Sequence, residues 1–189
     1  MPNRLVLLCA GATAAVREGR FGTERDALDA GGRAKVCAFA LPGPPPARCV
    51  VSPAAAARET ATLLGVEAEV DAALRDRDHG AWAGKSLSAI DPVALRGWLA
   101  APEAAVAGGE SMDAVGDRVA AWLGALEEGR LLAITHAAVL RAAVARVMGV
   151  PAAATAAIDI APLTMLILSR HDRWRIKELR SGGAAGTYP

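Results

Sequence analysis

The sequence has no long apolar run and no excess of one charge, and each absence argues against a class of protein. No stretch offers about 18 consecutive apolar residues without a breaker, so neither a transmembrane helix nor a membrane partner is expected. The 21 Lys and Arg residues are balanced by 20 Asp and Glu residues, unlike the concentrated basic surface of nonspecific nucleic-acid binding. A nucleic-acid partner is therefore not expected.

The sequence also lacks a paired cysteine framework. Its three cysteines, Cys9, Cys37 and Cys49, are odd in number and show no CxxC spacing, so we interpret them as reduced cytosolic thiols, at least two of them buried. Residues 1–16 superficially resemble a secretory signal, but their apolar run is short and continues as the first strand of an α/β pattern. A cytoplasmic protein is therefore expected.

The chain is long enough for one domain with a full core, at 189 residues and 53% hydrophobic content. We expect that domain over 1–180, followed by a disordered Gly- and Ala-rich tail over 181–189. Strands are predicted over 4–9, 49–51, 66–70, 131–135, 163–168 and 174–179, and helices over 29–41, 52–64, 92–100, 111–126 and 137–148. Ser52 and Ser111 are expected to be N-caps, with Pro53 in the first helical position after Ser52.

This alternation predicts an α/β fold, a three-layer sandwich with a mainly parallel central sheet flanked by helices. The last two strands are expected to pair antiparallel at one edge of the sheet. The stretch LLAITHAAVLR, over 131–141, describes a buried strand that ends at Thr135 and His136 and continues into a helix. Because ligands bind at the carboxyl ends of strands in open α/β sheets, His136 is a candidate for chemistry; capping or packing is the alternative.

Five segments, in their shared order, resemble the histidine phosphatase superfamily, also called the phosphoglycerate mutase-like family. They are GRFGTERDALDAGGRAK, VVSPAAAARETATLLG, LRDRDHGAWAG, GGES and ITHAAVLR, and the resemblance covers Arg4 to Leu179. In this family the first strand ends in Arg-His-Gly, and that histidine attacks phosphorus. A second histidine and one or two arginines hold the phosphoryl oxygens, while an acidic side chain protonates the leaving oxygen, as the charge on a transferring phosphoryl group demands. The resemblance implies a histidine phosphatase-like fold.

The chain departs from this family at the positions that handle phosphate. The first-strand arginine falls on Cys9 and the nucleophile on Ala10, whose methyl group cannot attack phosphorus. The phosphate-binding arginine of the second segment falls on Ala56, and the loop asparagine falls on Val16. The positions that keep a family residue are His136, Asp76, Arg58, Thr13 and Ser111. We therefore expect a pocket that is larger, less positive and more apolar than that of the relatives, without ordinary phosphomonoesterase activity.

The retained residues favour an enzyme that is not a phosphatase. His136 and Asp76 are predicted to perform general acid–base chemistry on a small, relatively apolar metabolite, by isomerisation, dehydration, cyclisation or hydrolysis, without cofactor or metal. The predicted substrate-binding residues are Cys9, Ala10, Gly11, Thr13, Arg58, Trp82, Ser111 and Ala137. The alternatives are a ligand- or partner-binding pseudophosphatase and a residual phosphatase or mutase. A roomy cavity favours the enzyme, and a collapsed one favours the pseudophosphatase.

Three further questions stay open at the level of sequence. Cys9 is either a thiolate nucleophile activated by His136 or a small apolar filler at the end of a buried strand. His79 occupies a position where relatives carry an aromatic residue, which favours packing over catalysis, and its spacing from Asp76 and His136 matches no standard metal site. A homodimer is possible through the apolar face of the helix after Ser111 or through the edge strands.

Overall fold

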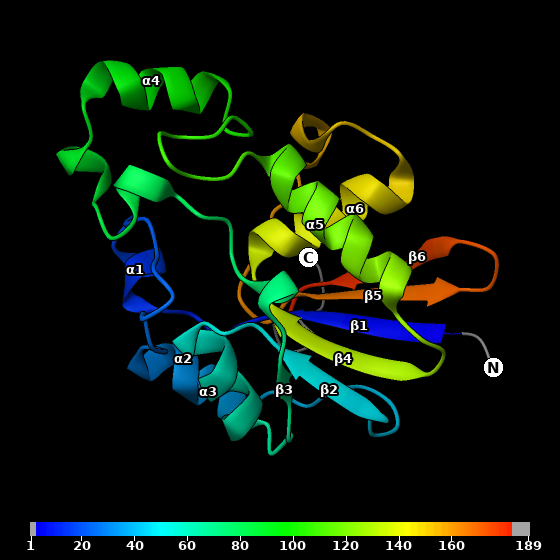
Figure 1. The fold of residues 1–189 in the computed structure, drawn as a ribbon. Coiled ribbons are helices and arrows are strands. Elements are labelled where there is room, and N and C mark those ends of the chain that lie inside the picture. The colour runs from blue at the N-terminus through cyan, green and yellow to red at the C-terminus, as the bar shows by residue number, and fades with distance from the viewer. Residues whose placement is uncertain (1–2, 183–189) are drawn as a thin grey trace, which may run out of the picture.

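The computed structural model describes residues 3–182 and contains a six-stranded sheet with helices on both faces (Figure 1). The strands are β1 (Asn3–Cys9), β2 (Arg48–Val51), β3 (Glu69–Val70), β4 (Arg130–Thr135), β5 (Met165–Arg170) and β6 (Trp174–Arg180). The α-helices are α1 (Ala14–Arg17), α2 (Ala30–Cys37), α3 (Ala55–Leu63), α4 (Pro92–Ala100), α5 (Met112–Ala125) and α6 (Ala137–Met148). No helix within residues 3–182 is long and apolar enough to cross a membrane.

The sheet has the strand order β3-β2-β4-β1-β5-β6. Strands β3, β2, β4 and β1 are parallel, whereas β5 runs antiparallel to β1 and to the edge strand β6. The predicted mainly parallel sheet with an antiparallel edge pair is therefore confirmed. β6 leaves its outward face mostly exposed, as expected for an edge strand.

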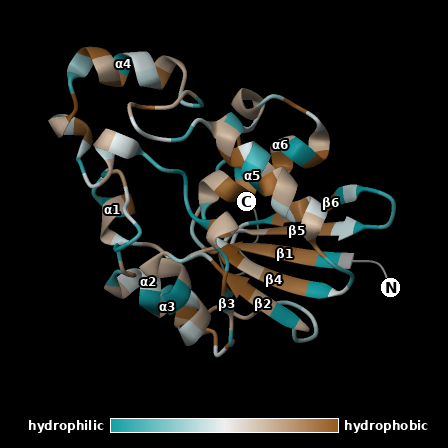
Figure 2. Cartoon of the chain, viewed as in Figure 1, coloured by the Kyte–Doolittle hydropathy of each residue, from teal (hydrophilic) through white to brown (hydrophobic). Residues whose placement is uncertain are grey.

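Alternation along the central strands produces two separate apolar layers. Leu5 and Leu7 of β1 face the cluster that contains the buried residues of α5 and α6, while Leu8 faces the cluster that contains α2 and α3. Successive strand residues point to opposite faces, so a strand buried on both sides is apolar along its buried length, as Figure 2 shows for β1 and β4 beyond their hydrophilic first residues. The three-layer arrangement follows from this pattern.

The site is positioned by the register between β1 and β4. The two strands pair in parallel with Cys9 opposite Thr135, and the Ala10 N–H donates to the Thr135 carbonyl at 2.8 Å. Both strands therefore end at the same edge of the sheet, which brings Ala10 beside His136. α6 begins immediately after His136, which is its N-cap residue.

Two local predictions differ from the structure, and a third cannot be compared with it. Ser52 is not the N-cap of α3: Ala54 is, without a side-chain capping bond, because the Ser52 hydroxyl is directed to His136 instead. The strand expected over 66–70 is only Glu69–Val70, because it pairs with just the last two residues of β2. The predicted tail over 181–189 lies outside the described residues except for its first two. Ser111, in contrast, caps α5 as expected.

Candidate active site

A cavity of about 470 Å³ opens at the carboxyl ends of β1 and β4. Six of the predicted site residues line it at the strand ends and in the turns that follow them: Cys9, Ala10, Gly11, Thr13, His136 and Ala137. Asp76 also lines it and comes from the long segment between β3 and α5. Gly11 is required here for space, because a Cβ at this position would lie 2.7 Å from Val36 Cγ2. The cavity is therefore roomy and not collapsed.

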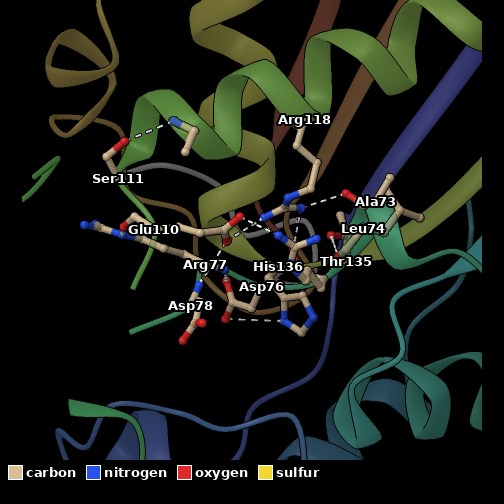
Figure 3. Close-up of polar contacts among 12 residues, drawn as sticks. Ala73, Leu74, Asp76, Arg77, Asp78, Glu110, Ser111, Arg118, Thr135 and His136 are labelled. Atoms are coloured by element: carbon tan, nitrogen blue, oxygen red, sulfur yellow. Dashed lines mark hydrogen bonds and ion pairs between the residues drawn. The ribbon is translucent and has the colours of Figure 1, made fainter. Parts of the chain in front are cut away.

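His136 and Asp76 face one another in this cavity (Figure 3). The distance from His136 Nδ1 to Asp76 Oδ2 is 3.6 Å, longer than a normal hydrogen bond, so neither group is fully occupied by the other. The Asp76 side chain is 46% exposed, and its other oxygen accepts the Arg77 backbone N–H at 2.8 Å. The His136 side chain is 13% exposed. The pair is held in place yet open to a substrate.

The second ring nitrogen of His136 has a partner that sequence reasoning missed. His136 Nε2 lies 2.8 Å from Ser52 Oγ, and Ser52 is fully buried at the end of β2. The Ser52 hydroxyl oxygen also accepts the Ala54 backbone N–H at 3.3 Å. One feature of the sequence points to this contact, because Ser52 follows a buried strand that lies next to β4 in the sheet. A Ser-Pro pair before a helix is equally typical of an N-cap, which is the role that the sequence predicts for Ser52.

The positions that the sequence resemblance predicts to depart from the family motif lie in the same cavity. Cys9, Ala10 and Ala56 line it, together with Val16, whose side chain remains 63% exposed. These four positions of the cavity lining therefore present a thiol, two methyl groups and an isopropyl group. None of these four side chains can donate a charge-assisted hydrogen bond to phosphate.

The arginines that line the cavity are bound to other groups. Arg77 is buried and donates to the carbonyls of Pro102, Ala104 and Glu110, and Arg75 donates to the Glu110 carboxylate at 2.6 Å. Burial lowers the pKa of Arg77, an effect that nearby carboxylates oppose. These contacts tie the segment between β3 and α5 to itself, as Figure 3 shows around Glu110. Both guanidinium groups thus support the fold around the cavity.

Three predicted substrate-binding residues lie outside the cavity lining. Arg58 is exposed on α3, and Ser111 accepts the Ala114 N–H at 3.1 Å as the cap of α5. Trp82 packs in an aromatic cluster with Phe21 and Trp98, at ring-centroid distances of 5.3 and 5.9 Å. This cluster joins the chain after α1 to α4, which lies apart from the sheet in Figure 1.

Cys9 and His79 have environments that bear on their reactivity. Burial, with a further contribution from the charge of Asp76, raises the pKa of the Cys9 thiol to about 12, so the thiolate is disfavoured at neutral pH. Burial lowers the pKa of His79, whose ring packs 4.9 Å from that of Phe21.

Cys9 and Cys49 are buried and Cys37 is exposed, which confirms the prediction of at least two buried thiols. Among residues 3–182, no group of three His, Cys, Asp or Glu side chains is arranged to hold a metal ion.

Comparison with known proteins agrees with this fold. A mycobacterial protein described as hydrolase 1 is 26% identical, with a TM-score of 0.81 over 97% of this chain and 100% of that one. A mycobacterial glucosyl-3-phosphoglycerate phosphatase is also 26% identical, with a TM-score of 0.78 over 94% of this chain and 98% of that one. TTHB049 from Thermus thermophilus is 28% identical, with a TM-score of 0.72 over 94% of this chain and 99% of that one. No curated protein matches the chain.

The family model for the histidine phosphatase superfamily, branch 1, matches residues 5–181, which is nearly the whole chain. This match agrees with the mainly parallel sheet flanked by helices. The chain belongs to the histidine phosphatase superfamily, branch 1.

Proposed function

We propose that this member of the superfamily is an enzyme that has given up phosphohistidine chemistry and uses His136 with Asp76 as an acid–base pair. The observation that carries the proposal is the pair itself, 3.6 Å apart in a cavity where Cys9, Ala10 and Ala56 occupy the phosphate-handling positions. The groups that would bind or attack phosphate are absent from those positions, whereas both groups that move protons are retained. Such a pair suits proton transfer on a substrate that is not a phosphate ester.

The proposed substrate is small, relatively apolar and carries at most a weakly charged reacting group. The 470 Å³ cavity is within the range of small-molecule sites, and its lining includes Cys9 and Ala10 at the end of β1 and Ala56 in the first turn of α3. α6 begins at the cavity without a side-chain cap, so its first N–H groups carry a partial positive charge. Partial charge of this kind suits a single oxyanion that develops during isomerisation, dehydration, cyclisation or hydrolysis.

A metabolite mixture provides the direct test. The purified protein is incubated with metabolite extract, and substrate loss and product gain are followed by mass spectrometry. Turnover is expected in the wild type and in His171→Asn, a matched control in the exposed turn between β5 and β6. Loss of general acid–base catalysis costs about 10²- to 10⁴-fold, so His136→Asn and Asp76→Asn should lower the rate by at least 100-fold.

Each of the other outcomes would indicate a different function for this protein. Ligand-induced thermal stabilisation without any turnover would identify a binding protein that resembles a pseudophosphatase. Release of inorganic phosphate that depends on His136 would identify a residual phosphatase or mutase. Turnover that survives in both variants would remove the His136 and Asp76 pair from the reaction.

A further inference from the structure

The contact between Ser52 and His136 bears on which ring nitrogen of His136 carries the proton. Ser52 Oγ lies 2.8 Å from His136 Nε2, and its oxygen accepts the Ala54 N–H at 3.3 Å. Ser52 is fully buried, and its side chain is outside the cavity lining, so it cannot itself reach a substrate. Its hydroxyl proton nevertheless requires an acceptor, because an unpaired buried donor costs about 1–3 kcal/mol.

One of the two neutral tautomers of His136 gives the buried Ser52 hydroxyl an acceptor and also places an N–H, rather than a lone pair, toward Asp76. If Ser52 donates its proton to His136 Nε2, the imidazole is neutral with its proton on Nδ1, and this N–H points toward the Asp76 carboxylate. If Nε2 carried the proton instead, His136 would donate to Ser52, and no other acceptor for the Ser52 hydroxyl is found among residues 3–182. The lone pair on Nδ1 would then face a carboxylate oxygen, which is repulsive.

We propose that Ser52 is a positioning residue that holds His136 in the Nδ1–H tautomer. The consequence is a division of roles, which rests on the proposed function. In the resting protein the half-exposed Asp76 carboxylate is the base of the pair, and the Nδ1–H of His136 is a neutral hydrogen-bond donor to the substrate oxygen. The 3.6 Å separation between Nδ1 and Asp76 Oδ2 leaves both groups free to contact the same substrate.

The tautomer is measured without any substrate, by nitrogen-15 NMR of the imidazole rings at alkaline pH. The sequence has only three histidines, so His136→Asn and His171→Asn suffice to assign the signals. The wild type is expected to show a pyrrole-type shift at His136 Nδ1 and a pyridine-type shift at Nε2. In Ser52→Ala the two tautomers should mix, because free imidazole favours the proton on Nε2. Ser52→Thr keeps the hydroxyl and should restore the wild-type shifts.

Two results would overturn the assignment. A pyrrole-type Nε2 in the wild type would show that His136 donates to Ser52. Unchanged shifts in a folded Ser52→Ala variant would show that another group sets the tautomer. The NMR measurement needs no turnover, so this proposal can fail independently of the proposed function. Loss of activity in His136→Asn tests the reaction, and the nitrogen-15 shifts of His136 test the role of Ser52.

Discussion

Restoring one arginine to the cavity is expected to restore phosphate binding. Ala56 is buried in the first turn of α3 and lines the cavity, and the sequence resemblance predicts a phosphate-binding arginine of the family at this position. A guanidinium group there would form a bidentate contact of two charge-assisted hydrogen bonds, each worth about 1.5–3 kcal/mol. The Ala56→Arg variant should therefore bind phosphate about 10²- to 10⁴-fold more tightly than the wild type.

Isothermal titration with inorganic phosphate, and with orthovanadate as its transition-state analogue, measures this difference. The matched control is Ala56→Met, which adds a side chain of similar length without charge and should bind as weakly as the wild type. The cavity of about 470 Å³ has room for either side chain. The reasoning would be refuted if the wild type already bound phosphate tightly, or if Ala56→Arg bound no better than Ala56→Met.

The remaining predictions concern the surroundings of the cavity. Arg77→Met should lower the free energy of unfolding in urea by about 3 kcal/mol, because three carbonyls lose a charged donor. The control is Arg96→Met at an exposed position, and equal urea midpoints for the two variants would contradict the expectation. Ser111→Ala should cost about 1 kcal/mol through loss of the α5 cap and leave ligand affinity unchanged, so a large affinity change would place Ser111 in the site. His79→Phe should remove a pH dependence of stability: burial lowers the pKa of His79 from 6.5, so the unfolded chain binds the proton more readily, and wild-type stability falls as the pH drops below about 6.5. A variant that kept this acid-side slope in unfolding experiments would exclude His79 as its source.

The sheet and its strand-end site could be predicted because they depend on local patterns. Continuous apolar runs define β1 and β4, and their parallel pairing places Ala10 beside His136. The motif order also located Asp76, which lies in a segment with little regular structure. Short 3-10 turns at 72–74, 80–82 and 87–89 in that segment carry no periodicity, so its path around Arg77 and Glu110 could not be derived from spacing.

Long-range side-chain contacts are what the sequence did not reveal. Ser52 and His136 are 84 positions apart, and a Ser-Pro pair before a helix is equally typical of capping. Trp82 and Ser111 lie near the site in the motif order, yet one packs in an aromatic cluster and the other caps a helix. A residue's place in a motif indicates its neighbourhood, whereas its partners depend on the packing of several distant segments.

The central claim is that this superfamily member no longer transfers a phosphoryl group, and hydrolysis of p-nitrophenyl phosphate tests it most directly. The wild type is expected to release p-nitrophenol no faster than the uncatalysed reaction, and His136→Ala is expected to behave identically. Rapid hydrolysis by the wild type that disappears in His136→Ala would contradict it.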